Sequence, residues 1–368
     1  MRRVLVILLT SSALLFSTTP SFSLELLDQY LRATELAQPG VLIIDPKDGS
    51  VLAENRVDEV RIPASVLKLL SATTALTYLG ADKRFETSIW STSVKNSYVL
   101  IGEMDPWLTS NLSLAKKNKQ RYLPTLVNKA NAKEAQSITV YYSGLYSKDL
   151  QELSKHLAKR KIKVKAVPIA MKDARGKVKE KITGFTSEPM TTMVSFAILW
   201  SDNQLADRLA TTAVKKAGNP VTPQGMTATF KAALSEIGVS SEGLNIEDGS
   251  GLSKANRISP RTLAELLIKI RNNPRFQSIY DGLPIGGRTG TLAKRFANAP
   301  DAVDHVHAKT GFLSNVVSLA GYVESGNNEY VFVILVDGIR PRLSERKAAR
   351  EVMDQMLNVI AKGNLQTP

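Results

Sequence analysis

The chain has 368 residues, 43% of them hydrophobic, a formal net charge of +14 and no cysteine. This length allows one large domain with a smaller one, and the apolar content excludes a globally disordered chain. The absence of cysteine excludes disulfides, thiolate metal sites and a cysteine nucleophile. It leaves the compartment open, because an exported protein need not carry disulfides.

The N-terminus is predicted to be a cleaved signal peptide, residues 1–23. Arg2 and Arg3 form a positive n-region, Val4–Phe16 is a largely apolar h-region, and Ser21–Ser23 has the small-x-small pattern of a signal peptidase site. A retained membrane anchor is the alternative, but the apolar run is short for a bilayer span. We therefore expect a protein that works outside the cytoplasm, in the periplasm.

After this segment the sequence predicts a short helix and then a hairpin. Leu24–Leu36 has an amphipathic helical pattern. Gly40–Ile44 and Ser50–Ala53 are strand-like and flank Asp48-Gly49, a strong short-range hairpin signal. A buried helix is predicted next, over Ala64–Leu79, because its apolar residues recur with helical period.

Most of the positive charge lies in residues 111–181, which hold 18 Lys and Arg against 5 Asp and Glu. Strand-like alternation at Ile138–Tyr142 and Ile162–Val167 flanks a helical stretch that presents one apolar face, formed by Leu150, Leu153 and Leu157. This pattern predicts a small basic α/β insertion. A solvated basic face is the common explanation of such a charge run, and peripheral contact with an anionic wall polymer or membrane is the other.

The remaining chain returns to longer elements. Thr191–Ala213 and Pro260–Ile270 have helical periodicity. Val316–Val323 and Tyr330–Asp337 are predicted to form an antiparallel hairpin, and Arg346–Ile360 a closing helix.

Three short motifs occur in one order: Ser65-Val-Leu-Lys68, Ser201-Asp-Asn203 and Lys309-Thr-Gly311. Each alone is weak, since Ser113-Leu-Ala-Lys116 also matches the first and Arg288-Thr-Gly290 nearly copies the third. Together, and in suitable local contexts, they indicate a serine acyl-transferase.

The motif residues match what acyl transfer needs. Positions i and i+3 of a helix share a face, so Lys68 can reach Ser65 and act as its base if burial or a neighbouring cation lowers the lysine pKa. Lys309 is predicted to be that cation. On a turn between helices, Ser201 can pass a proton to the leaving amine, and Asn203 can hold the peptide carbonyl.

The third motif is suited to an extended peptide that ends in a carboxylate. Lys309 and Thr310 can attract the carboxylate, and Gly311 lets the chain approach closely. The sequence contains no Gly-x-Ser-x-Gly elbow, phosphate loop or His-Glu-x-x-His motif. His305 and His307 could pair as metal ligands, but no third histidine lies nearby in the sequence, so a structural role is favoured.

These residues resemble the class C low-molecular-mass penicillin-binding proteins, the penicillin-binding protein 4 type of D-alanyl-D-alanine carboxypeptidase/endopeptidase. The resemblance covers about residues 39–105 and 188–337. Further similar blocks surround the motifs: Pro63–Leu69, Asp248–Ser253, Gly290–Arg295 and Ala308–Tyr322.

The resemblance implies an α/β (α+β) fold of the penicilloyl-serine-transferase or β-lactamase-like type, with an antiparallel sheet flanked by helices. We expect this catalytic domain to comprise residues 24–110 and 182–368, and residues 111–181 to be inserted in it. No metal or organic cofactor is implied.

The resemblance also assigns roles. It implies that Ser65 is the nucleophile, Lys68 its base, Ser201 and Asn203 the partners of the second motif, and Lys309 and Thr310 the carboxylate side. The backbone N–H groups of Ser65 and Phe312 are expected to form the oxyanion hole. Gly311, which precedes Phe312, is expected to line the substrate-binding site.

The sequence departs from the family pattern at three places. Phe312 stands where a Thr or Ser hydroxyl is usual. Only residues 69–200 separate the first two motifs, whereas relatives carry two sizeable inserted domains there. Gly102-Glu-Met-Asp-Pro106 keeps only part of the Gly-Ser-Gly-Asp-Pro entry to that insertion.

The sequence therefore predicts an exported serine D-Ala-D-Ala carboxypeptidase, or also an endopeptidase, that acts on peptidoglycan stem peptides. β-Lactam antibiotics are its expected covalent inhibitors, and no nucleic-acid partner is expected. Two alternatives remain: a β-lactamase, which would deacylate quickly, and a catalytically weak wall-binding scaffold.

Overall fold

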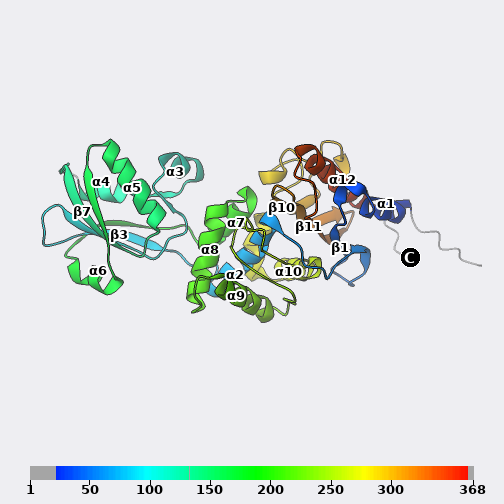
Figure 1. The fold of residues 1–368 in the computed structure, drawn as a ribbon, viewed down its shortest axis with the longest axis horizontal. Helices are drawn as coiled ribbons and strands as arrows, with labels where there is room; N and C mark the ends of the chain where they lie inside the picture. Colours follow the sequence, from blue (N-terminus) through cyan, green and yellow to red (C-terminus); the bar gives the residue numbers. More distant parts are fainter. Residues whose placement is uncertain (1–21, 132, 364–368) are drawn as a thin grey trace, which may run out of the picture.

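The computed structural model describes residues 22–131 and 133–363, which form two lobes side by side (Figure 1). The larger lobe contains both ends of the described chain, and the smaller lobe is inserted between them. The predicted signal peptide lies outside the described residues, except for positions 22 and 23, which begin α1 (Phe22–Leu31). Over the described ranges, no helix has both the length and the apolarity to cross a bilayer.

The larger lobe is built on a five-stranded antiparallel sheet. Its order is β10, β11, β12, β1, β2, so the first and last strands of the chain meet in its middle. Both predicted hairpins are confirmed, and β12 and β1 join them edge to edge. The strands are β1 (Gly40–Ile44), β2 (Val51–Asn55), β10 (Val306–Phe312), β11 (Val317–Ser325) and β12 (Asn328–Val336).

Helices cover both faces of this sheet because its central strands are apolar on both sides. In β1, Val41 and Ile43 point into one hydrophobic core and Leu42 into the other. The first core is closed by α1 and α12 (Leu343–Ala361). The second lies under α2 (Lys68–Leu79), α7 (Met190–Trp200), α8 (Asn203–Lys216), α9 (Pro223–Glu236), α10 (Pro260–Asn272) and α11 (Gln277–Asp281).

The smaller lobe has its own five-stranded sheet, in the order β8, β7, β4, β3, β9. Helices α4 (Pro124–Ala130) and α5 (Ser147–Lys159) pack on it through a separate apolar core, and α6 (Met171–Lys177) contacts β4 and β7. The strands are β3 (Glu86–Ser91), β4 (Ser97–Gly102), β7 (Ser137–Ser143), β8 (Lys163–Pro168) and β9 (Lys181–Thr186). The short elements β5 (Leu108–Thr109), α3 (Leu112–Asn118) and β6 (Arg121–Tyr122) complete the lobe.

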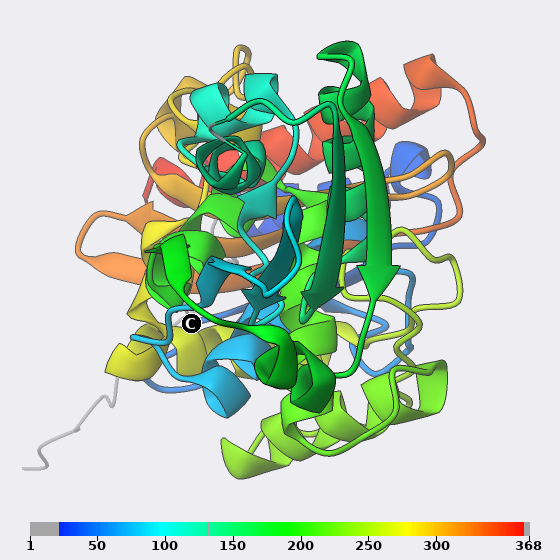
Figure 2. The same ribbon diagram turned by 90° about the vertical axis from the view of Figure 1, so that its left-hand side faces the viewer.

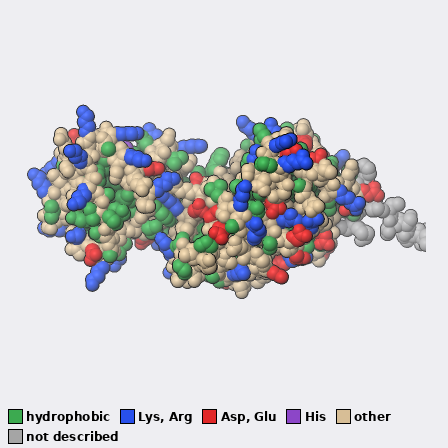
Figure 3. All heavy atoms as spheres, viewed as in Figure 1, with side chains coloured by type: hydrophobic (Ala, Val, Ile, Leu, Met, Phe, Trp, Pro, Cys, Tyr) green, Lys and Arg blue, Asp and Glu red, His purple; other side chains and the backbone are tan. Residues whose placement is uncertain are grey.

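This second sheet reaches beyond the range 111–181 expected for the insertion. It takes β3 and β4 from before residue 111, and β9 continues to Thr186. The reason is strand pairing: β4 pairs with β7 in parallel, and β3 pairs with β9. Figure 2 views the molecule from the end that carries this lobe, and in Figure 3 lysine and arginine side chains are scattered over its surface.

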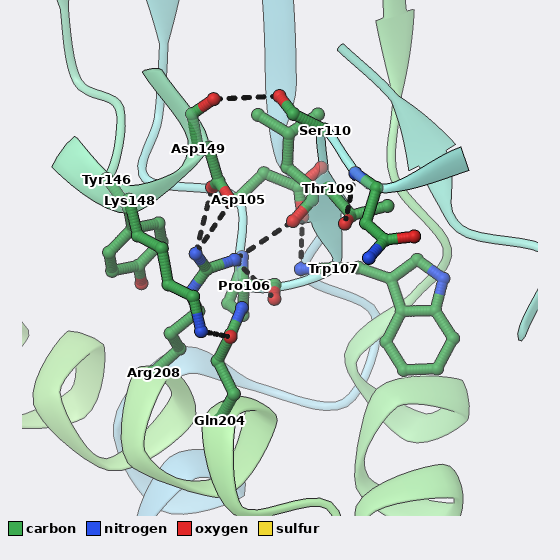
Figure 4. A network of polar contacts seen from close by, with 12 residues as sticks. Asp105, Pro106, Trp107, Thr109, Ser110, Tyr146, Lys148, Asp149, Gln204 and Arg208 are labelled. Carbon is green, nitrogen blue, oxygen red and sulfur yellow. Dashed lines mark hydrogen bonds and ion pairs between the residues drawn. The ribbon is translucent and has the colours of Figure 1, made fainter. Parts of the chain in front are cut away.

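A buried ionic network joins the two lobes (Figure 4). Arg208 of α8 donates to both carboxylate oxygens of Asp149 on α5, each at 2.9 Å, and to the carbonyl of Leu108 at 2.9 Å. The guanidinium also lies over the Tyr146 ring, 4.0 Å from its centre. Nearby, Asp105 is fully buried and accepts a hydrogen bond from the backbone of Trp107. This network fixes the base of the inserted lobe to the helix that begins with Asn203.

Candidate active site

Ser65 lies on a 3-10 turn, Ala64–Leu67, that leads directly into α2. The turn is strained, because Ala64 has a φ of 49°, in the left-handed region. Gly251 packs so close that a Cβ there would lie 1.9 Å from the Ala64 carbonyl oxygen. Ser65 itself is half-buried, so its hydroxyl remains accessible on a rigid turn.

Lys68 is the first residue of α2 and is 1% exposed. Its Nζ lies 2.8 Å from the Ser65 hydroxyl, 2.7 Å from the Asn203 side-chain oxygen and 2.5 Å from the Ser250 carbonyl oxygen. Burial lowers the pKa of Lys68 to about 8, although the carboxylate of Asp207 opposes this shift. At pH 7 about a tenth of the Lys68 side chains are therefore neutral and able to accept a proton.

The second motif is the break between α7 and α8. Ser201 has a φ of 56° and ends α7, and Asp202 caps α8 by accepting a hydrogen bond from Leu205 at 2.8 Å. Asn203 then begins α8. The single helical stretch predicted over Thr191–Ala213 is thus two helices, and their junction brings Ser201 and Asn203 to one side.

Lys309 is fully buried on β10, and its Nζ lies 2.9 Å from the Ser201 hydroxyl and 3.0 Å from the Thr310 carbonyl oxygen. Burial and the charge of Lys68 hold the pKa of Lys309 well below its ordinary value. The two lysines repel each other across the site, so the loss of one proton from the pair is favoured. Lys68 is the member that contacts the Ser65 hydroxyl.

The block Asp248–Ser253 forms a tight loop whose centre is the Asp248 carboxylate. This carboxylate accepts hydrogen bonds from the backbone N–H groups of Ser250 at 2.8 Å and of Gly251 and Ser253 at 2.5 Å. The folded loop aims the Ser250 carbonyl at Lys68. Asp207 of α8 anchors the loop by accepting from Gly249 at 2.9 Å, and burial raises the pKa of Asp207 to about 6.

These groups open onto a cleft of about 410 Å³. One wall is the last part of β10, the edge strand of the main sheet. Gly311 permits close packing there, since a Cβ would lie 2.6 Å from the Pro63 carbonyl oxygen. The cleft is lined by Ser65, Ser201, Asn203, Leu252, Thr291, Lys294, Arg295, Thr310, Gly311, Phe312, Val317 and Arg350.

The structure thus brings together all eight residues that the sequence singled out. The two competing motifs lie elsewhere. Ser113 and Lys116 are exposed on α3 of the inserted lobe. Arg288 of the near-copy Arg288-Thr-Gly290 forms an exposed ion pair with Asp304 at 2.5 Å.

Several residues at this site were not assigned a role from the sequence. Ser250 contributes a backbone carbonyl, which no side-chain motif reveals, although its Asp-Gly-Ser-Gly-Leu-Ser block resembles a block of the family. Asp207 follows the second motif by one turn of α8, and that spacing could have indicated it. Thr291 lies 2.8 Å from the Thr310 hydroxyl. Arg350 comes from the closing helix α12, and nothing in its local sequence connects it with the cleft.

Comparison with known families agrees with this geometry. Residues 24–121 and 125–362 match the D-Ala-D-Ala carboxypeptidase 3 (S13) family. The chain belongs to this family. Among curated relatives, the D-alanyl-D-alanine carboxypeptidase DacB of Haemophilus influenzae is 32% identical over 172 residues, 46% of this chain and 36% of that protein. The D-alanyl-D-alanine carboxypeptidase of Actinomadura sp. is 32% identical over 178 residues, 47% of this chain and 32% of that protein.

The match spans about a third of the length of these two curated relatives. Fold similarity extends further. The crystal structure of penicillin binding protein 4 from Haemophilus influenzae superposes with a TM-score of 0.71 at 18% identity, covering 90% of this chain and 97% of that chain. At this identity the likeness concerns the fold, and it confirms the predicted fold class, an antiparallel sheet flanked by helices with an inserted lobe.

Proposed function

We propose that this S13 member is an exported serine D-Ala-D-Ala carboxypeptidase that acts on peptidoglycan stem peptides through an acyl-enzyme on Ser65. The observation that carries the proposal is the contact of the Ser65 hydroxyl with a buried lysine amine, 2.8 Å away, whose pKa is lowered to about 8. A serine hydroxyl attacks poorly without such a base.

In the proposed acylation, Lys68 accepts the Ser65 proton while the serine oxygen attacks the carbonyl carbon of the penultimate D-alanine. The backbone N–H groups of Ser65 and Phe312 hold the oxyanion that forms. Asn203 positions the peptide. Ser201, which accepts from Lys309, is placed to deliver a proton to the leaving amine.

The C–N bond then breaks, and D-alanine leaves with the proton that Ser201 delivered to its amine. The proton that Lys68 took from Ser65 is returned to Ser201, so Lys68 is neutral again. Water attacks the ester on Ser65, again with Lys68 as base, and regenerates the hydroxyl. Each step uses only side chains and backbone of this chain, so the proposal needs no metal or organic cofactor. The same attack on a β-lactam ring leaves no separate leaving group, which makes these drugs the expected covalent inhibitors.

Labelling with a fluorescent penicillin tests the proposal. We expect the mature protein to form a stable adduct that is lost in Ser65→Ala and retained in Ser113→Ala, whose serine belongs to the exposed second Ser-x-x-Lys motif on α3. Rapid turnover of a chromogenic β-lactam would instead favour the β-lactamase alternative. A well-folded wild type that forms no adduct and turns over no β-lactam would contradict the proposal and favour a wall-binding scaffold.

We further propose that the basic surface of residues 111–181 contacts an anionic wall polymer or membrane peripherally. Its support is charge alone: 18 Lys and Arg against 5 Asp and Glu. We expect co-sedimentation with anionic lipid vesicles or wall polymer at low salt, lost at high salt and after charge reversal across Lys155–Lys165. Equal behaviour of wild type and the reversed variant would leave a solvated face as the explanation.

A further inference from the structure

The proposed reaction requires a group that recognises the free carboxylate of the substrate's last residue, and the cleft offers several cations. Lys309 is fully buried, and its Nζ is occupied by Ser201 and the Thr310 carbonyl. Lys294 is exposed to solvent, so a contact with it would be weak. The two remaining cations, Arg295 and Arg350, are both half-buried in the wall of the cleft.

Arg295 already has a partner. Its Nε and Nη2 both donate to the carboxylate of Asp354 on α12, and Nη2 also donates to the carbonyl of residue 350 at 3.3 Å. This pair fastens the loop after Gly290 to the closing helix. Arg295 is therefore a structural cation, and its charge is compensated.

Arg350 differs, since no carboxylate lies within 4.0 Å of its guanidinium in residues 22–131 and 133–363. Its guanidinium carbon lies 4.3 Å from the centre of the Phe312 ring. This stacking orients the planar group in the cleft wall, and its N–H donors make no hydrogen bond to the described residues. Burial and the charge of Arg295 lower the pKa of Arg350, and the carboxylate of Asp354, which is paired with Arg295, opposes this shift only in part.

We propose that Arg350 binds the C-terminal carboxylate of the peptide substrate, with the Phe312 ring as the platform that orients its guanidinium. The inference rests on the proposed carboxypeptidase function and names the group that recognises the C-terminal residue of the substrate. Phe312 has no hydroxyl that could donate to a carboxylate. Its ring instead stacks against Arg350, whose guanidinium has N–H donors. A guanidinium can take both oxygens of one carboxylate at once, which a single hydroxyl cannot.

Arg346 provides a matched control within the same helix. Its guanidinium carbon lies 4.5 Å from the centre of the same Phe312 ring, so it makes a similar stacking contact. It donates to the Leu313 carbonyl at 3.2 Å and is absent from the lining of the cleft. The two arginines thus share charge and ring stacking, but Arg350 lines the cleft whereas Arg346 is bonded to a backbone carbonyl outside it.

The test compares a peptide ending in D-Ala-D-Ala with the same peptide ending in a carboxamide, using full mature protein. For Arg350→Gln we expect kcat/KM on the acid to fall about 10- to 100-fold, which is the usual range for the loss of a charge-assisted hydrogen bond. On the amide, kcat/KM should fall by less than about threefold, because the amide has no carboxylate to lose. Arg346→Gln should leave both rates within about threefold of wild type. Thermal melts of both variants check that α12 remains folded.

Equal losses on acid and amide in folded Arg350→Gln would overturn the inference, as would equal effects of the two arginine variants on the acid. A second variant supplies a gain of function: Phe312→Thr combined with Arg350→Gln should recover acid turnover relative to Arg350→Gln alone, because a hydroxyl replaces the lost donor. No recovery in a folded double variant would also count against carboxylate binding here. A wild type that cleaves neither peptide and forms no penicillin adduct would instead defeat the proposed function, and the inference with it.

Discussion

Two buried clusters of charge contact α8, one through Asn203 and one through Arg208, and they are satisfied in different ways. At the joint between the lobes, Arg208 has its charge matched by both oxygens of Asp149 and its donors filled by backbone carbonyls. In the cleft, Lys68 and Lys309 are equally buried, yet in the described part of the chain neither lies within ion-pair distance of a carboxylate.

The difference separates a structural charge from a reactive one. A buried ion pair with ideal geometry holds its elements together, and removing one partner leaves an uncompensated charge. A buried amine without a counter-charge instead has a lowered pKa and exchanges its proton easily. The same helix therefore carries a rigid attachment for the inserted lobe and, at its N-terminus, a side chain of the candidate catalytic site.

The largest expected effect is on acylation by Lys68→Met. We expect the second-order rate of penicillin acylation to fall by about 10³- to 10⁴-fold, because the Ser65 hydroxyl loses its base. The free energy of unfolding should stay the same or rise, since an apolar side chain replaces a buried cation. Stopped-flow acylation and denaturant titration measure the two quantities. Lys116→Met, at the exposed copy of the motif, is the control and should change neither.

The opposite pattern is expected at the joint. Arg208→Met should lower the free energy of unfolding by about 3–5 kcal/mol, because it leaves Asp149 buried without its partner. Acylation by the protein that remains folded should change by less than about threefold. Lys148→Ala, which removes an exposed contact to Gln204 at the same joint, should cost no more than about 0.5 kcal/mol. Similar stability of the two variants would show that the buried pair is not the attachment.

The pH dependence of acylation sharpens the contrast. Lys68 must be neutral to accept a proton, and its pKa is lowered to about 8, so the rate should rise about tenfold per pH unit below pH 8 and level off above it. Asp207→Asn should move the midpoint to lower pH, because the carboxylate that raises the Lys68 pKa is gone. A midpoint near 10.5, the ordinary lysine value, would contradict the role of burial.

The smallest effect concerns Asp105, beside the joint. Burial raises the pKa of this carboxyl to about 7, so the folded state favours its protonated form. Stability should therefore be lost as the pH rises from about 4 to 7, and Asp105→Asn should lack that loss. Between pH 5 and pH 8, we expect the free energy of unfolding of Asp105→Asn to rise by roughly 1–3 kcal/mol relative to that of wild type, as measured by denaturant unfolding. The account would be contradicted if the two proteins differed in unfolding free energy by the same amount at pH 5 and at pH 8.

Sequence reasoning predicted the parts of the fold that depend on local pattern. Asp48-Gly49 marked the β1–β2 hairpin, and the helical period after Pro63 placed Ser65 and Lys68 on neighbouring turns. The inserted sheet was harder to delimit. Its strand β3 pairs with β9, which lies almost a hundred residues later in the sequence. Nothing in the local sequence of Glu86–Ser91 indicates which strand will be its partner.

The candidate site divides in the same way. Side chains within the three motifs were predicted, because their chemistry is visible in residue type and spacing. Ser250 and Arg350 were not, since one acts through its backbone carbonyl and the other reaches the cleft from the last helix. Both depend on how distant elements pack, and packing follows from the complete fold rather than from any window of sequence.

The most direct test of the account is the release of D-alanine from a peptide ending in Lys-D-Ala-D-Ala, measured beside the same peptide ending in L-Ala-L-Ala. We expect the wild type to release one D-alanine per peptide and to leave the L-peptide intact. Ser65→Ala should release none, and a quenched reaction should show the acyl group on Ser65. Absence of D-alanine release by folded wild-type protein, or release that persists in Ser65→Ala, would contradict the central claim.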